Sequence, residues 1–238
     1  MYVERFYRQW VGARSLSRFE VKVEQSDLLV LCDRNLEHRA RCALYDARAQ
    51  IENYIDLHAG FKTSMKPVNV DEDAAGIVRR MGHAGRRWDV GPMAAVAGAV
   101  SQYVGESLLE ESTTVIVENG GDVFLKAPRK VRFALYAGED STFKDRVSFE
   151  VDARGGLGVC TSSGRVGPSI SFGKADAVVA IADDAAFADA AATAIANRIS
   201  KPDDVSVEVD GAKENGALRG LVACCGDRLG IWGDVELV

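Results

Sequence analysis

Apolar and polar residues alternate near the start of the chain in the two-residue period of a β-strand. Residues 4–10 and 17–31 predict a hairpin, because the alternation holds up to Gln25 and residues 28–31 are then all apolar. By its pattern, the chain therefore begins with paired strands.

The period then changes to that of a helix. Apolar residues recur at near-helical spacing from about 35 to 58, which predicts a long amphipathic helix that Gly60 ends. A shorter helix is predicted at about 71–84. Another has a buried first half and begins at Pro92, a residue suited to the first helical position. Gly98 within that helix costs stability, which indicates close approach by another element.

Strand patterns dominate the second half of the chain, and several are joined by turns that contain Gly or Asp. One further helix is predicted at 185–199, with Asp183 or Asp184 as its N-cap. This order of elements favours an α+β fold class with largely antiparallel sheet. The predicted strands are a strand–turn–strand unit at 113–127 and single strands at 131–138, 146–153, 157–162, 175–182, 205–210, 217–225 and 228–238.

The composition argues against several classes of protein. The 238 residues carry a formal net charge of −6, without the basic excess of a nucleic-acid binder. Five cysteines without a CxxC pair, and three histidines, argue against a zinc site and a disulfide framework. The N-terminus lacks the apolar core of a signal peptide, and no apolar run approaches the roughly 20 residues that span a bilayer. We therefore expect a cytoplasmic protein of one domain, with residues 1–60 packing on a motif-bearing core at 61–238.

The alanine-rich helix FADAAATAIANR (187–198) carries a single polar stripe. Asp189, Thr193 and Asn197 are each four residues apart and share one face. Hard cations such as Mg²⁺ take carboxylate and hydroxyl oxygens, so Asp189 and Thr193 are candidate ligands. Two simpler interpretations stay open: a stripe that faces water, or a Thr193 hydroxyl bonded to the carbonyl of Asp189.

The turn in VENGGDVF (117–124) is a second candidate. Asn119, Gly120 and Gly121 fit a hairpin turn that needs positive φ. The functional interpretation is that the glycines let the backbone pass close to a ligand, while Glu118, Asn119 and Asp122 supply polar contacts.

A long segment with many small hydroxyl residues, 158–176, separates two apolar strands. Long irregular segments inside compact domains are often functional. A Walker A loop is excluded, because the spacing from Gly167 to Lys174 is one residue too long and Ala175 stands where Ser or Thr would bind magnesium. Cys160 is a candidate nucleophile, but no histidine lies near it in the sequence, which favours a buried strand thiol. The small residues of interest are Thr161, Ser162, Ser163, Gly164, Ser169 and Ser171.

Four segments rich in small residues follow one another along the chain, and their order is informative: DVGPMAAVAG, VENGGDVF, TSSG and ADAAATAIAN. Together they resemble the ApbE superfamily, whose best-known members are FAD:protein FMN transferases. Those proteins carry a D-x-G-x-x-A-K-G helix start, an N-x-G-G-D/E turn, a T-S-G segment and an A-D-A-x-A-T-A helix. The resemblance covers about residues 60–200. It is greatest to a branch of the superfamily that shares VGPMAAVAGA, ENGGD, TSSG, SFGKADA and ADAAATA.

The resemblance implies an α+β, T-fold-like arrangement of antiparallel sheet and long helices. It also implies a Mg²⁺ site, formed by Asp189, Thr193 and a backbone carbonyl within 91–95. Mg²⁺ would bridge the pyrophosphate of FAD, a small-molecule nucleotide, while FMN is transferred to a threonine of another protein. The nucleotide cleft would be lined by Asn119, Gly120, Gly121 and Asp122, with Thr161, Ser162, Ser163 and Gly164 near the phosphates.

Two departures from the transferase pattern keep the function open, and no residue is assigned as catalytic. Ala95 and Val96 replace the Lys-Gly pair, and the His-x-x-Asp-Pro-x-x-Gly segment expected after T-S-G is missing. The first hypothesis is a Mg²⁺-dependent flavin-binding protein that acts as an FMN transferase. The second is an accessory enzyme of sulfur assimilation, because the similar branch is linked to homocysteine formation in anaerobes. The third is a non-catalytic binding subunit, in which the N-terminal hairpin pairs with a second copy to form a homodimer.

Overall fold

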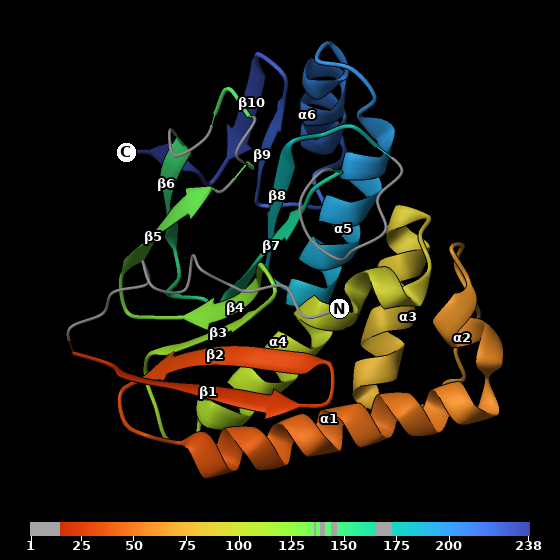
Figure 1. Ribbon diagram of the computed structural model, residues 1–238, viewed down its shortest axis with the longest axis vertical. Helices are drawn as coiled ribbons and strands as arrows, with labels where there is room; N and C mark the ends of the chain where they lie inside the picture. The colour runs from red at the N-terminus through yellow and green to blue at the C-terminus, as the bar shows by residue number, and fades with distance from the viewer. Residues whose placement is uncertain (1–14, 136, 139–140, 144–146, 165–172) are drawn as a thin grey trace.

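The large sheet of the computed structural model consists of eight strands, all of them antiparallel (Figure 1). The structure describes residues 15–135, 137–138, 141–143, 147–164 and 173–238. In spatial order the strands are β1 (Ser17–Val23), β2 (Ser26–Cys32), β3 (Val115–Asn119), β4 (Asp122–Lys126), β7 (Leu157–Ser162), β8 (Ala177–Ala182), β9 (Gly220–Cys225) and β10 (Arg228–Gly233). A second, smaller sheet has the order β11 (Glu236–Leu237), β6 (Val147–Asp152) and β5 (Lys130–Leu135).

The helices cover one face of the large sheet, and the small sheet covers the other. Successive residues of β8 show this arrangement, because Val178 and Ala180 join the core beneath the helices while Val179 and Ile181 join the core shared with β5 and β6. The helical elements are α1 (Glu37–Leu57), α2 (Ala59–Thr63), α3 (Gly76–Trp88), the 3₁₀ helix η2 (Pro92–Ala95), α4 (Val96–Leu108), α5 (Ala185–Arg198) and α6 (Asp204–Asn215).

The predicted α+β class with antiparallel sheet is confirmed. The hairpin at 17–31, the long helix that begins near residue 35 and the helix at 185–199 correspond to β1–β2, α1 and α5. Asp184 caps α5, because its side chain accepts a hydrogen bond from the backbone N–H of Phe187 at 2.9 Å. Residues 4–10 lie outside the described residues.

The strand predicted at 205–210 is wrong, because these residues belong to α6. Val205, Val207 and Val209 alternate as in a strand, but Val205 and Val209 are also one helical turn apart and both face β10. Val207 is 68% exposed, as the outer side of a helix allows. Gly230 makes the packing of α6 possible, since a Cβ at that position would lie 2.7 Å from the Val209 side chain.

The helix predicted at 71–84 begins later, at Gly76, and runs on to Trp88. Tyr54 of α1 holds the chain before it in another conformation. The Tyr54 hydroxyl donates to the carboxylate of Asp71 at 3.2 Å and accepts from the Asp71 backbone N–H at 3.3 Å. A tertiary contact therefore keeps this acidic stretch out of the helix that its composition favours.

Gly98 marks the closest approach of α4 to α5, as its position in the sequence predicts. A Cβ at Gly98 would lie 2.2 Å from the carbonyl oxygen of Ala185 and 2.9 Å from the Cβ of Asp189. On the sheet side, a Cβ at Gly158 of β7 would lie 2.3 Å from the Cα of Ala185. The beginning of α5 is thus held between two glycines, one on α4 and one on β7.

We expect Gly98→Ala to lower the free energy of unfolding by about 1–3 kcal/mol, because the added methyl group forces α4 and α5 apart. Gly211→Ala is the matched control. Gly211 also lies inside a helix, but no atom is within 4 Å of its added Cβ, so this change should stabilise the protein by about 0.5–1 kcal/mol. Urea unfolding of both variants tests the close approach, and equal effects would contradict it.

Candidate active site

The carboxylate of Asp189 lies at the amino end of α4. It projects from the second turn of α5, is 9% exposed, and accepts a hydrogen bond from the backbone N–H of Gly98 at 2.9 Å. Gly98 is the third residue of α4, where a backbone N–H has no partner within its own helix. Asp189 therefore serves as an N-cap for a different helix, and the dipole of α4 stabilises its negative charge.

The turn between β3 and β4 faces the same helix end. Gly120 and Gly121 have φ values of 72° and 103°, as the predicted hairpin turn requires. The Asn119 amide donates to the carbonyl of Ala97 at 3.2 Å, and the carboxylate of Glu118 accepts from the N–H of Gly121 at 2.9 Å. The first contact fixes the turn against α4, and the second stabilises the turn itself.

Asp122 is the first residue after this turn, and its carboxyl group is buried at 8% exposure. Its Oδ1 atom has no hydrogen-bond partner among the described residues. Burial and the nearby charge of Asp189 raise the pKa of Asp122 well above its usual range, although the Thr161 backbone N–H and the Cys160 thiol lower it in part. The pKa of Asp189 is also raised by burial, partly offset by the N–H groups of Gly98 and Ala97.

Cys160 of β7 contacts both α5 and Asp122. Its thiol donates to the carbonyl of Ala185 at 3.2 Å, and the residue is fully buried. Burial, followed by the charges of Asp122 and Asp189, raises the pKa of the thiol well above its usual value. Cys160 is thus a neutral thiol that packs on α5, as expected for a strand residue, and it lacks the thiolate that a nucleophile needs.

A polar network at the start of α5 was not predicted from the sequence. The side-chain oxygen of Gln102 accepts from the N–H of Ala185 at 2.6 Å, and its amide nitrogen donates to Glu106 at 2.8 Å. Arg80 of α3 then pairs with Glu106 at 3.1 Å and with the capping residue Asp184 at 3.2 Å. The one sequence signal for it is a glutamine within the buried face of α4.

The other candidate residues divide into two groups. Thr193 is half-buried on α5, one turn after Asp189, and the Thr161 side chain lies 3.8 Å from the position of a Cβ on Gly121. Ser163 and Gly164 instead bond to the segment before β8: the Ser163 hydroxyl donates to the carbonyl of Asp176 at 2.6 Å, and the Gly164 N–H to that of Ala175 at 2.9 Å. Ser162 is buried. Ser169 and Ser171 lie outside the described residues.

The structure therefore brings Asn119, Gly121, Asp122, Thr161 and Asp189 together around the amino end of α4. Two carboxylates and hydroxyl groups are suited to a hard cation. Within the described ranges, no three or more His, Cys, Asp and Glu side chains are grouped as a metal site. Also within these ranges, no helix has the length and apolar character to cross a bilayer.

Solved structures with a similar architecture include ApbE proteins. The flavinyl transferase ApbE of Pseudomonas stutzeri matches with a TM-score of 0.54 and 14% identity, over 91% of this chain and 94% of that one. The ApbE protein of Thermotoga maritima matches with a TM-score of 0.57 and 13% identity, over 87% and 94%. At such identities the likeness shows the fold alone.

Sequence comparison identifies the family to which the chain belongs. The family model described as AbpE bacteria matches residues 8–217, and the protein belongs to this family. It is 40% identical over 209 residues to a UPF0280 protein of Methanosarcina barkeri, which covers 86% of this chain and 82% of that protein. A UPF0280 protein of Methanocaldococcus jannaschii is 39% identical over 222 residues, covering 90% of each. The predicted membership of a branch of the ApbE superfamily is thus confirmed.

The buried carboxyl pair predicts how stability depends on pH. The raised pKa values mean that the folded state keeps protons which the unfolded chain has already released, so the free energy of unfolding falls as pH rises above about 4. Each unit of elevation corresponds to about 1.4 kcal/mol. Urea unfolding in the presence of a chelator should therefore show a more stable protein at pH 5 than at pH 8.

Asp122→Asn should flatten this dependence, because the amide does not ionise. Asp210→Asn removes a carboxylate from the exposed side of α6 and should leave the dependence unchanged. The same slope in wild type and Asp122→Asn would contradict the assignment.

Proposed function

We propose that this protein binds a flavin nucleotide together with Mg²⁺ at the Asp122–Asp189 pair. The observation that carries the proposal is the Oδ1 atom of Asp122, which is buried without a hydrogen-bond partner among the described residues. A buried carboxylate oxygen without a hydrogen-bond partner is unfavourable unless the group binds a proton or a cation. A second buried carboxyl group close by makes a divalent cation the better match.

The donor set fits Mg²⁺, which usually takes one or two protein carboxylates and leaves its other positions to phosphate oxygens and water. Asp189 and Thr193 would hold the ion with a carbonyl from 91–95, and we add Asp122 as a second carboxylate. Asp189 can keep its hydrogen bond to Gly98 through Oδ2 while Oδ1 contacts the ion. Bound Mg²⁺ neutralises charge on the phosphates of a nucleotide.

We propose a flavin as the nucleotide because solved proteins with a similar fold act on flavins. The solved proteins from Pseudomonas stutzeri and Vibrio cholerae are named flavinyl or flavin transferases. In the proposed site Asn119, Gly120 and Gly121 line the nucleotide cleft beside α4, and residues 161–164 approach the phosphates. The Ser163 hydroxyl and the Gly164 N–H already bond to carbonyl groups of the segment before β8, so in the proposed site these two residues fix the shape of the chain beside the phosphates.

We expect flavin binding to depend on Mg²⁺ and on Asp189. Calorimetry with FAD should give an affinity at least tenfold higher with Mg²⁺ than with chelator, which is about 1.4 kcal/mol. Asp189→Asn should remove that gain, because the amide can still accept from Gly98 but carries no charge for the ion. Thr193→Val should reduce the gain, and Asp122→Asn should do the same.

Asp210→Asn controls for the loss of one negative charge far from the site and should bind as the wild type does. Circular dichroism and the urea midpoint verify that each variant is folded. Equal affinity with and without Mg²⁺ in wild type would refute the metal part of the proposal. No heat with FAD or FMN under any condition would refute the flavin part.

Transfer of FMN to another protein is a further step that separates an enzyme from a binding subunit. Transfer to a threonine hydroxyl breaks the pyrophosphate bond of FAD and releases AMP. Without an acceptor, AMP is released only when water takes the FMN phosphoryl group, so we expect AMP release to be slow until an acceptor protein is added. Chromatographic detection of AMP, with and without candidate acceptor proteins, tests this expectation.

The sulfur-assimilation hypothesis finds no support in two buried thiols, Cys160 beside the site and Cys224 on the other face of the sheet. Cys160 is a buried neutral thiol, and burial raises the pKa of Cys224 to about 12. Neither is available as a thiolate at neutral pH.

A further inference from the structure

The outer face of α1 carries a histidine and a cysteine one helical turn apart. His38 and Cys42 are both exposed, and Cys42 Sγ lies 3.9 Å from His38 Nδ1 and 4.0 Å from Nε2. Imidazole nitrogen and thiolate sulfur are the ligands that zinc prefers. Among the cysteines of the chain, Cys42 alone is exposed, whereas Cys32, Cys160, Cys224 and Cys225 are buried.

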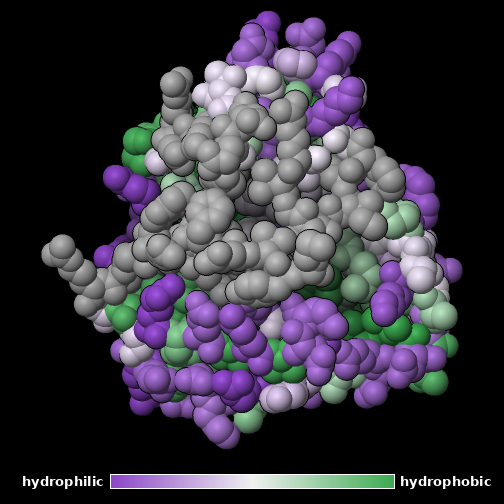
Figure 2. All heavy atoms as spheres, in the orientation of Figure 1, coloured by the Kyte–Doolittle hydropathy of each residue, from purple (hydrophilic) through white to green (hydrophobic). Residues whose placement is uncertain are grey.

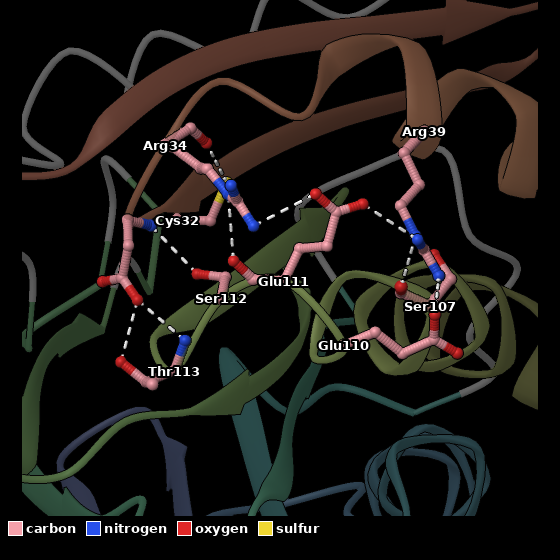
Figure 3. A network of polar contacts seen from close by, with 9 residues as sticks. Cys32, Arg34, Arg39, Ser107, Glu110, Glu111, Ser112 and Thr113 are labelled. Carbon is pink, nitrogen blue, oxygen red and sulfur yellow. Dashed lines mark hydrogen bonds and ion pairs between the residues drawn. The ribbon is translucent and has the colours of Figure 1, made fainter.

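The positive side chains beside this pair are neutralised. Arg39 reaches across to α4 and the segment after it, where it donates to the carbonyl of Ser107 at 2.7 Å and pairs with Glu111 at 2.9 Å and with Glu110 (Figure 3). Arg41 pairs with Glu37 at 2.7 Å. Neither guanidinium group therefore opposes a cation at the histidine–cysteine pair.

We propose that His38 and Cys42 form half of a Zn²⁺ site, and that a second copy of this chain supplies the other half. In tetrahedral zinc sites a sulfur and a nitrogen ligand lie about 3.5 Å apart, given Zn–S and Zn–N bonds of about 2.3 and 2.0 Å. The observed distances need only a small rotation of either side chain. Binding converts the Cys42 thiol to a thiolate, and its proton passes to water.

The second copy follows from the number of ligands. Zinc takes four ligands, and the described residues place no third His, Cys, Asp or Glu beside this pair. A twofold axis through the ion would supply a second His38 and a second Cys42, which gives the common Cys₂His₂ set. The sequence argued against zinc because it has no CxxC pair and only three histidines, and a site that takes one histidine and one cysteine from each of two chains needs neither.

The surface around the pair suits contact between two helices. Tyr45 and Ala49 continue the exposed stripe after Cys42, and Tyr45 is 56% exposed. Neither side chain is charged. Asp46 is also exposed on this side of α1, but its carboxylate accepts hydrogen bonds from Gln50 and from the Tyr103 hydroxyl of α4, so two copies of α1 can approach along the stripe. α1 lies along one edge of the molecule (Figure 1), and in the same view the surface there is mainly hydrophilic with apolar areas between (Figure 2). The metal, and not a large apolar patch, would provide most of the affinity.

The test uses the full chain, reduced with a non-coordinating reductant and freed of metal with a chelator. Zn²⁺ is titrated while the mass is followed by analytical ultracentrifugation, and Co²⁺ serves as a spectroscopic probe. We expect the mass to double at half an equivalent of metal per chain. A thiolate-to-cobalt charge-transfer band should rise in parallel, and chelator should reverse both.

His38→Ala and Cys42→Ser should each lower the affinity for Co²⁺ at least tenfold and abolish the dimer. Both side chains are exposed, so the fold should not change. The double exchange of His38→Cys with Cys42→His keeps one ligand of each kind at the same spacing and should restore the metal-dependent dimer. Asp189→Asn should dimerise like the wild type, which separates this site from the proposed Mg²⁺ site.

Three results would overturn the proposal. One is a full equivalent of zinc bound per chain without dimerisation, as expected if residues outside the described ranges complete the site. Another is a dimer that forms equally well with chelator, as expected for pairing through the edge of β1. The third is a zinc-dependent dimer that persists in both single variants.

Discussion

The contact between the Asp189 carboxylate and the amino end of α4 is the constraint on which the rest of the structure depends. It requires α5 to lie so close to α4 that only glycine fits at position 98. The same closeness explains why α5 consists mainly of alanine, because larger side chains would push it away from α4 and β7. The sheet, the two helices and the candidate site are therefore set by one close approach.

The buried pair formed by Asp122 and Asp189 lowers the stability of the folded protein. A core of this kind is most stable with apolar side chains, and burial makes the ionised form of each carboxyl group unfavourable. The network of Gln102, Glu106 and Arg80 holds the start of α5 in place near these groups. Buried carboxyl groups with raised pKa values are typical of binding sites, where a bound ligand compensates the cost of burying them.

Much of the architecture follows from local patterns in the sequence. The period of α1, the cap of α5 and the Asn119-Gly120-Gly121 turn each depend on residues close together in the chain, and each appears as predicted. Gly98 was informative in a different way, since a glycine weakens a buried helix and is favoured there when a neighbouring element takes the space of a side chain.

The sequence was misleading where a distant residue decides the outcome. Valines that alternate at 205–209 fit a strand or one face of a helix, and Gly230 of β10 selects the helix. Tyr54 delays the start of α3 through its hydrogen bonds to Asp71. Asp122 of β4 and Asp189 of α5 lie near each other only in the folded protein. The resemblance to the ApbE superfamily assigned Asp122 to the nucleotide cleft and Asp189 to the Mg²⁺ site, and so did not predict that they form a pair.

The sheet order also has a consequence for how the chain folds. Most neighbouring strands in the large sheet are also consecutive along the chain, and β4 beside β7 is the exception. The longest connection between two paired strands of this sheet joins β2 to β3, because Leu29 lies opposite Glu118 with α1, α3 and α4 in between. Closing so long a loop is slow compared with forming a hairpin. During synthesis on the ribosome, β1 and β2 emerge long before β3, so β2, whose residues 27–32 are buried in the folded protein, must wait for its second partner strand. Chaperones and misfolding therefore have their main opportunity at β2, before the first half of the chain can join the second.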